Sequence, residues 1–504
     1  MTMQKPTENY QSSISNHNKN RIKSLLLYCA SFVALTTIYY YFSTFFGLNS
    51  DRASVLLEAK DILNGNIFLD GWYLSTVPFY FTETLPLAFL SLLFSPKSFL
   101  LHLMPALYYS LVVLLSFNLM RKKNKSCTPF IGLMLIPSPF FASNSITACV
   151  HIGAIIVGLV IINSYTKINS PITKVMLSLI TGLALYSDNL LLYFLIIPII
   201  MATTISILKK RRIDEFVHAI IPIGSILFSK IINLYFYSIN SFVMPITEPP
   251  HFATLEQFGF NLKLMIEALL KLFGADILGG SVTDTTTIMA LINIIIIPCF
   301  FIMTIKAIKT NNTFEFVDYI LLSSSVMLPA AFLASNTPSD MGSSRYLIPP
   351  IISFVIFIGR NAKMPTQKHQ LLTVGAIIFC GINCYKFSKS NNYDTSHLVA
   401  EYLKNNNFSE GFANYWRASS SSVIMDNGNT VIAPVNVNTI DGKIYAYKWL
   451  SNSKWFDLQS RYIILNSDEQ LHALTRKFGD DAYIKKINDT YIVIYKDKRL
   501  SITG

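Results

Sequence analysis

Uncharged apolar runs long enough to cross a lipid bilayer recur along this chain from residue 24 to about residue 387. A helix needs roughly 20 consecutive apolar residues to span the bilayer core. Apolar residues make up 52% of the 504 residues and charged residues only 14%. The length alone would allow several soluble domains, but the apolar composition is the stronger indication of the class of protein. The sequence therefore predicts an α-helical polytopic membrane protein.

The formal net charge of +12 does not indicate a nucleic-acid partner, because the basic residues gather in short loops between the apolar runs. Lys and Arg concentrate in the cytoplasmic loops of membrane proteins. The first such group, Lys19, Arg21 and Lys23, precedes the first apolar run. We therefore expect residues 1–23 to form a cytoplasmic tail and residues 24–387 to form the membrane domain.

Alternation of the basic loops predicts about eleven spans, with the N-terminus inside and the C-terminus outside. The run Phe79–Phe94 contains Glu83 and Pro86, and a crossing there would place the next basic cluster outside. We therefore expect an interfacial or re-entrant helix at this run. The expected spans are residues 24–46, 99–120, 128–141, 147–165, 175–187, 190–208, 216–237, 286–305, 317–334, 346–359 and 371–385.

The stretch Ser50–Glu83 follows the first apolar run and belongs to the expected outer loop 47–98. Its first half repeats apolar residues at helical spacing and ends at Asn64-Gly65, where glycine can take a positive φ. We therefore predict a short amphipathic helix, with Ser50 as its N-cap and Asp51 in its first turn. Such a helix lies on a membrane surface more naturally than across it, which would hold Asp51 at the interface.

Four residues with acidic or imidazole side chains are candidates for a site. Asp51 is a candidate general base, and the alternative is a solvated acid beside a helix N-cap. Glu83 in an apolar run is a functional candidate because burying its charge is costly, and the alternative is a water-exposed interfacial residue. Asp188 lies at an expected outer turn, where an ordinary turn residue is the favoured interpretation. His151 is interpreted as a core histidine hydrogen-bonded within the bundle.

Arg345 is the only cation in the expected outer loop Ser335–Arg345 and is followed by Tyr346. A guanidinium there could grip a phosphate bidentately, and the alternative is an interfacial anchor. Lys97 is a weaker candidate for a cation that contacts a phosphate. Trp72 suits either an aromatic belt or a sugar-stacking surface, which the sequence does not separate. No Gly-rich nucleotide loop, metal-ligand cluster or nucleophile elbow appears, so the sequence identifies no cofactor and leaves a divalent cation open.

The chain changes character from about residue 391, where a polar stretch of roughly 110 residues begins, an ordinary domain size. Helical patterns occur at His397–Lys404 and Ser467–Phe478. We expect residues 391–504 to form a small α/β domain on the outer, periplasmic face. Its β-rich segments are Thr430–Val435, Arg461–Leu465, Tyr483–Ile487 and Tyr491–Tyr495.

Three short motifs together resemble the GT-C superfamily of integral membrane glycosyltransferases. They are Asp51 with the VLLEAK segment after it, Gly71-Trp72, and Arg345-Tyr346-Leu347-x-Pro349. The similarity is to enzymes that use lipid-linked sugars, including the protein mannosyltransferase and aminoarabinose transferase branches. It implies that Asp51 occupies the catalytic acidic position and, more loosely, that Arg345 contacts the lipid phosphate. Many members have Asp-Glu where this chain has Asp51-Arg52, so the second acid of that pair is missing here.

The composition and size are also similar to those of bacterial glucosyltransferases that modify the O-antigen of lipopolysaccharide. We therefore expect a multi-pass glycosyltransferase of the bacterial inner membrane. It would move a sugar from a polyprenyl-phosphate donor to a cell-envelope glycan, lipid or protein, with membrane lipids around it. Two alternatives stay open: a transporter or lipid flippase, and a non-catalytic envelope assembly protein. A transporter usually shows internal repeats and polar residues inside its spans, and the sequence offers little of either.

Overall fold

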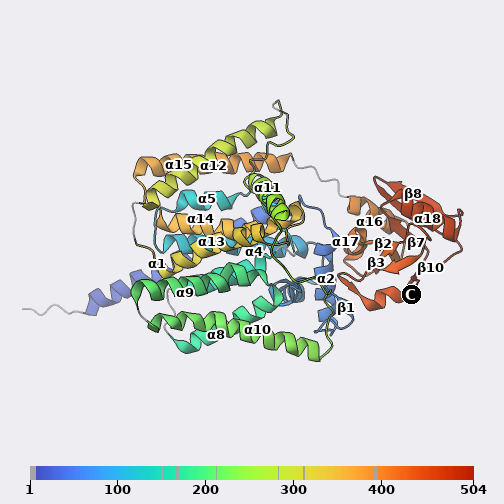
Figure 1. The fold of residues 1–504 in the computed structure, drawn as a ribbon, viewed down its shortest axis with the longest axis horizontal. Coiled ribbons are helices and arrows are strands. Elements are labelled where there is room, and N and C mark those ends of the chain that lie inside the picture. Colours follow the sequence, from blue (N-terminus) through green and yellow to red (C-terminus); the bar gives the residue numbers. More distant parts are fainter. Residues whose placement is uncertain are drawn as a thin grey trace, which may run out of the picture.

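The computed structural model describes residues 7–148, 151–165, 170–211, 213–281, 283–309, 313–389 and 395–503. Long helices run side by side in a bundle, and a C-terminal domain lies against one end of it (Figure 1). Within the described residues, eight helices are long and apolar enough to cross a membrane. The architecture is that of a polytopic α-helical membrane protein. The helices of the bundle and its ends are α1 (Thr7–Ser43), α2 (Ser50–Leu63), α3 (Leu85–Phe94), α4 (Leu100–Arg121), α5 (Thr128–Leu135), α6 (Pro139–Ser143), α7 (Ile152–Ser164), α8 (Pro171–Ser187), α9 (Ile197–Lys210), α10 (Ile220–Ser238), α11 (Leu255–Leu272), α12 (Thr285–Lys309), α13 (Phe316–Ala334), α14 (Ile348–Asn361) and α15 (Thr366–Ser388).

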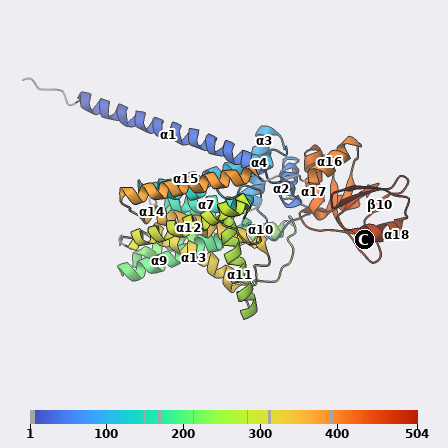
Figure 2. The ribbon, with the colours of Figure 1, turned by 90° about the horizontal axis from the view of Figure 1, so that it is seen from above.

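The N-terminal part of the long helix α1 projects from the bundle, at the end opposite the C-terminal domain (Figure 2), whereas its C-terminal part packs against α4 through Tyr39. The predicted run 128–141 is broken into α5 and α6, because Pro137 and Pro139 interrupt the helical backbone between them. The predicted run 147–165 contains α7, and residues 149 and 150 lie outside the described part of the chain. The expected re-entrant segment is a π-helical turn, η1 (Tyr80–Thr84), that continues into the ten-residue α3.

Basic residues from separate loops meet at the bundle end remote from the C-terminal domain. Lys123, after α4, donates hydrogen bonds to Asp318 at the start of α13 and to Asn361 at the end of α14. The buried Arg360 pairs with Asp318 at 2.7 Å and with Glu315 at 2.7 Å. These contacts place the ends of α4 and α14 beside the start of α13. The predicted alternation therefore brings those loops to one end, although the side of the membrane stays a prediction.

The C-terminal domain has a mixed six-stranded sheet with the strand order β4-β3-β2-β7-β9-β8. The predicted strands are present, but the parallel strand β2 and the helix α17 that follows it were not predicted. The expected boundary at residue 391 lies outside the described residues. The elements are α16 (Thr395–Asn405), β2 (Gly411–Asn414), α17 (Tyr415–Asp426), β3 (Ile432–Val437), β4 (Ile444–Ala446), β5 (Ser451–Asn452), η5 (Ser453–Asp457), β6 (Gln459–Ser460), β7 (Tyr462–Leu465), α18 (Asp468–Phe478), β8 (Tyr483–Ile487), β9 (Thr490–Ile494) and β10 (Leu500–Ser501).

Helix α2 lies between the bundle and the C-terminal domain, across the direction of the bundle helices (Figure 1). The predicted membrane-surface helix is therefore covered on its polar side, and α17 packs against it. Lys60 donates hydrogen bonds to the Gly428 carbonyl at 2.8 Å and to Asn429 at 2.7 Å. Gly428 has φ +74°, and a Cβ there would lie 2.1 Å from Leu57, so this contact requires glycine.

The N-cap of α2 differs from the prediction. The side chain of Asn49, not Ser50, accepts a hydrogen bond from the Arg52 amide at 3.0 Å. The Ser50 hydroxyl instead donates to the backbone carbonyl of Tyr415, the first residue of α17. The helix therefore begins one residue earlier than predicted, with Ser50 as its first residue.

A short antiparallel ribbon is a second connection between the bundle and the C-terminal domain. The strand β1 (Trp72–Tyr73) pairs with β5, with Trp72 opposite Asn452 and Tyr73 opposite Ser451. The two strands come from the loop between α2 and α3 and from the C-terminal domain. We call this pair the β1–β5 ribbon.

Candidate active site between the bundle and the C-terminal domain

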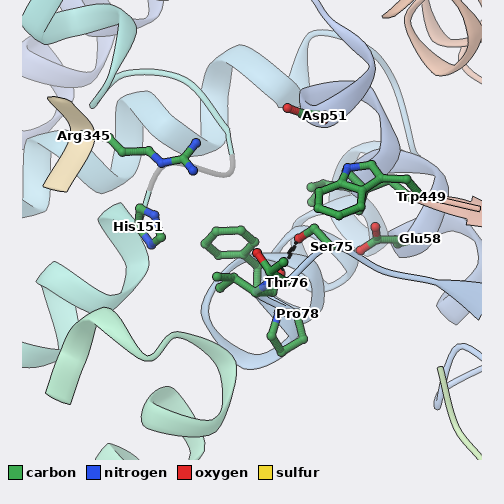
Figure 3. A pocket seen from close by; sticks show the side chains of 12 residues that line it. Asp51, Glu58, Ser75, Thr76, Pro78, His151, Arg345 and Trp449 are labelled. Carbon is green, nitrogen blue, oxygen red and sulfur yellow. Dashed lines mark hydrogen bonds between the residues drawn. The ribbon is translucent and has the colours of Figure 1, made fainter. Parts of the chain in front are cut away.

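A cavity of about 140 Å³ lies where α2, the bundle and the C-terminal domain meet (Figure 3). We call it the Asp51 cavity. Arg345 and His151 lie on one side of it, and Asp51, Glu58 and Trp449 lie on the other. Its full lining is Asp51, Val55, Glu58, Ser75, Thr76, Val77, Pro78, Phe79, His151, Arg345, Trp449 and Leu450.

Asp51 is held in place by both its own helix and the C-terminal domain. It lies in the first turn of α2, and the Tyr415 hydroxyl donates a hydrogen bond to its carboxylate. Burial raises the pKa of Asp51 above its usual value, while the Tyr415 hydrogen bond and the Arg345 and Arg52 charges oppose that rise. A carboxylate with a raised pKa is a better base than an ordinary aspartate.

Arg345 provides the positive charge opposite Asp51. It belongs to the 3-10 turn η4 (Met341–Leu347), whose N-cap Asp340 accepts a hydrogen bond from the Gly342 amide at 2.9 Å. The guanidinium lies over the Tyr346 ring, 5.2 Å from its centroid. One terminal nitrogen, Nη2, donates a hydrogen bond to the Tyr346 hydroxyl at 3.4 Å, and the buried Nε has no hydrogen-bond partner among the described residues. Donors of this cation are therefore available to an anion.

Asp188 and His151 form a buried pair on the same side as Arg345. The Asp188 carboxylate lies 2.8 Å from His151 Nδ1 and also accepts a hydrogen bond from the Leu190 amide. Asp188 is 1% exposed and His151 is 3% exposed, so the pair is more than an ordinary surface turn. The carboxylate fixes the orientation of the imidazole ring. The prediction that His151 is hydrogen-bonded within the bundle is confirmed, and His151 also lines the cavity.

A second cavity of about 200 Å³ adjoins the first, since both are lined by Val77 and His151. Tyr346 and Asp188 line it together with a mainly apolar wall. We call it the apolar cavity. Its full lining is Val77, His151, Asp188, Asn189, Leu190, Tyr193, Pro250, Leu328, Ala331, Phe332, Ser335, Thr337, Pro338 and Tyr346. The two cavities together form a charged compartment beside an apolar one.

Glu58 is a cavity residue that the sequence did not single out as a site. It lies two turns after Asp51 on α2, is 2% exposed, and accepts a hydrogen bond from Thr84 at 2.9 Å. Burial and the nearby charge of Glu83 raise the pKa of Glu58 to about 8. Glu83 itself is buried in η1 and does not line the Asp51 cavity. This raised pKa favours the protonated form of Glu58 at neutral pH.

Two other predicted residues lie outside both cavities. Trp72 is 1% exposed, and its indole N–H donates to Asp61 at 2.7 Å. Its ring packs edge-to-face on Trp455, with 5.1 Å between the centroids. Lys97 is exposed between α3 and α4 and lines neither cavity. Neither side chain lines the cavity that Asp51 and Arg345 share.

The C-terminal domain supplies the residues that sequence reasoning missed most completely. Trp449 and Leu450 close the Asp51 cavity from the segment between β4 and β5, and Tyr415 contacts Asp51 from α17. No local pattern marks these residues, because their role depends on contacts across more than half of the chain. Among the described residues, no group of three or more His, Cys, Asp or Glu side chains has metal-binding geometry.

Comparison of the sequence with protein-family models and with curated proteins finds no match to either. The resemblance to membrane glycosyltransferases therefore rests on the short motifs given above.

Proposed function

We propose that this protein is a membrane glycosyltransferase that uses a polyprenyl-phosphate-linked sugar. The observation that carries the proposal is the position of Asp51 and Arg345 on opposite sides of one cavity. A base and a phosphate-binding cation are the two groups that such a transfer needs. The outer face of the bacterial inner membrane is the proposed location, with a cell-envelope glycan, lipid or protein as acceptor.

The donor would bind across both cavities. Its phosphate would accept hydrogen bonds from Arg345, whose planar guanidinium suits a phosphate. His151, oriented by Asp188, would lie beside that phosphate. The first isoprenoid units would occupy the apolar cavity beside Leu328 and Phe332. An apolar wall there favours a lipid chain over a nucleotide, since burial of apolar surface drives such binding.

The reaction would be a substitution at the anomeric carbon of the donor sugar. Asp51 would take the proton of an acceptor hydroxyl while the acceptor oxygen forms a bond to that carbon. The bond from the anomeric carbon to the phosphate oxygen would break, and its electron pair would leave with the polyprenyl phosphate. Arg345 would stabilise the added negative charge of this leaving group. No nucleotide takes part in the step.

Lipid transport without transfer is the second candidate, because a charged cavity beside an apolar one also suits a phospholipid-like molecule. A transporter has no evident need for Asp51 as a base with a raised pKa. The two candidates differ in whether the bond to the sugar breaks.

The test uses the full-length protein in vesicles that contain a polyprenyl-phosphate sugar and an extract of envelope glycans and lipids. Mass spectrometry would detect a new glycosylated product, and a fluorescent lipid would report scrambling. Product that depends on Asp51 supports transfer. Lipid scrambling without a glycosylated product would overturn the proposal. Transfer directly from a nucleotide sugar, with no lipid-linked sugar present, would also overturn it.

A further inference from the structure

A separate cavity of about 230 Å³ lies on another face of α2, between this helix and the C-terminal domain. We call it the ribbon cavity, because residues of both strands of the β1–β5 ribbon line it. None of its residues lines the Asp51 cavity. Its lining is Leu57, Lys60, Asp61, Asn64, Trp72, Ser422, Gly428, Asn429, Val431, Ile432, Asn452 and Trp455.

Trp455 gives the ribbon cavity an aromatic wall, and the buried Trp72 supports it. Trp72 is fixed by its hydrogen bond to Asp61 and by the edge-to-face contact with Trp455. Trp455 is partly exposed, so part of its ring is free for a ligand. A tryptophan ring offers a broad apolar face at a small cost in conformational entropy. Such a face suits the C–H side of a sugar ring.

Polar groups with remaining hydrogen-bonding capacity surround this aromatic wall. Asp61 Oδ2 accepts hydrogen bonds from Trp72 and Asn66, which leaves Oδ1 as an acceptor. Asn452 accepts a hydrogen bond from the Lys454 amide through Oδ1, which leaves its Nδ2 as a donor. Donors and acceptors together suit hydroxyl groups, which both donate and accept.

The charges of the ribbon cavity favour an uncharged ligand. Lys60 and Asp61 carry opposite charges and both line the cavity. Asp61 disfavours an anion, while Lys60 disfavours a cation. The cavity volume exceeds by several times the roughly 30 Å³ that a water molecule occupies in the liquid. A neutral, ring-shaped ligand rich in hydroxyl groups fits these conditions.

The ribbon cavity and the Asp51 cavity are built from the same two segments. Residues 72–79 contribute Trp72 to the first cavity and Ser75 to the second, on either side of Leu74. Residues 449–455 likewise contribute Trp455 to the first and Trp449 to the second. The two cavities are therefore lined by neighbouring residues of the same two segments.

We infer that the ribbon cavity binds a non-reacting sugar ring of a glycan acceptor, while the reacting hydroxyl of that acceptor lies at Asp51. This inference rests on the proposed glycosyltransferase function and names an oligosaccharide as the acceptor class. Binding at a second point favours longer acceptors over single sugars. A distant ring that binds equally well in the ground state and in the transition state lowers the KM for the acceptor and leaves kcat little changed.

Asn452→Asp is the sharpest test, because it keeps the Oδ1 acceptor for the Lys454 amide and removes the Nδ2 donor. Trp455→Phe shortens the aromatic wall. Asn427→Asp is the matched control, since Asn427 Oδ1 also accepts a backbone hydrogen bond, from Ser98, outside the ribbon cavity. The thermal midpoint of each detergent-solubilised full-length variant reports its folding.

The probe is an array of envelope-type glycans from mono- to hexasaccharides, read with the full-length protein. We expect the wild type to bind oligosaccharides more strongly than monosaccharides. Asn452→Asp and Trp455→Phe should weaken this binding by about tenfold, the effect of one good polar contact. Asn427→Asp should bind as the wild type does. Absence of glycan binding by the wild type, or equal binding by folded variants, overturns the inference.

The vesicle transfer assay separates this failure from failure of the proposed function. Sugar transfer with an unchanged KM for the acceptor in Asn452→Asp would leave the proposed function standing and overturn the inference. Glycan binding that Asn452→Asp weakens, without any transfer by the wild type, would support the sugar site and overturn the proposed function. A raised KM with little change in kcat supports both.

Discussion

The Tyr415 hydroxyl donates a hydrogen bond to the Asp51 carboxylate although the two residues are 364 positions apart in the chain. Two further contacts join the same helix ends, since Ser50 donates to the Tyr415 carbonyl and accepts from the Ser420 amide. The first turn of α2 is therefore held by the first turns of α17. The C-terminal domain is part of the environment that sets the basicity of Asp51.

Asp51→Asn should lower turnover by roughly 10²–10⁴-fold, the usual contribution of a positioned base. The amide keeps the size of the side chain and can still accept from Tyr415. Protein abundance should change little. Product would be measured by mass spectrometry in vesicles. Asp70→Asn changes an exposed acid in the loop that follows α2; this variant is the control and should keep its activity. Normal turnover by folded Asp51→Asn would remove Asp51 from the catalytic role.

Tyr415→Phe should move the acidic limb of the pH profile of kcat/KM to higher pH. The Tyr415 hydrogen bond opposes the rise in the pKa of Asp51 that burial causes, so its loss raises that pKa further. More Asp51 is then protonated at a given pH, and less base is available. The ring contact with Tyr447 is retained, which protects the fold. A purely structural role for Tyr415 would lower activity without moving the limb.

Arg345→Lys should raise the KM for the lipid donor despite the retained charge. An ammonium cannot reproduce the planar guanidinium fork. Loss of one charge-assisted hydrogen bond costs about 1.5–3 kcal/mol, which is roughly tenfold or more in KM. Steady-state kinetics with varied donor would measure it. Lys97→Ala, at an exposed position outside both cavities, is the comparison, and an equal effect there would argue against Arg345 as the phosphate contact.

Glu58→Gln should stabilise the protein at alkaline pH and have little effect near pH 4.5. The pKa of Glu58 rises from its usual 4.5 to about 8, so the folded state keeps a proton that the unfolded state loses between these values. Stability of the wild type therefore falls as pH rises through this window, by up to about 1.4 kcal/mol per pH unit. The neutral glutamine has no such loss. Thermal midpoints of the wild type and of Glu58→Gln, measured in detergent from pH 4.5 to 8.5, should diverge as the pH rises. Parallel curves would contradict the prediction.

Reporter fusions test the membrane orientation. Fusions after Lys125 and Lys368, in basic loops, should report the cytoplasm, because positive loops stay inside. A fusion after Ser335, between α13 and η4, should report the outer side. A cytoplasmic signal after Ser335 would place the Asp51 cavity inside and contradict the proposed location.

Local patterns in the sequence predicted much of the fold. Long apolar runs predicted the bundle helices, and β-branched residues predicted strands such as β7 and β9. The helix α17 was missed because its centre, Ser419 to Ser422, has weak helix propensity and no apolar repeat. Packing against α2 and the sheet stabilises it instead.

The candidate site was predictable only in part. Arg345 stood out as the only cation of the expected outer loop Ser335–Arg345, and Asp51 stood out because it follows directly on the first apolar run and matches the acidic position of the resembled family. Glu58 did not, because burial and the nearby charge of Glu83, which only the fold brings to it, raise the pKa of Glu58. The contact between Trp72 and Trp455 was likewise not predictable, since the two residues lie far apart in the sequence.

The hydrogen bond from Tyr415 to Asp51 also sets when the candidate site can be completed during synthesis. A ribosome adds about 5–20 residues per second, so roughly 20–70 seconds separate the synthesis of these two residues. During that interval Asp51 and its helix exist without their partner domain. A nascent or truncated chain therefore has an open, unfinished site, and only the full-length polypeptide closes it.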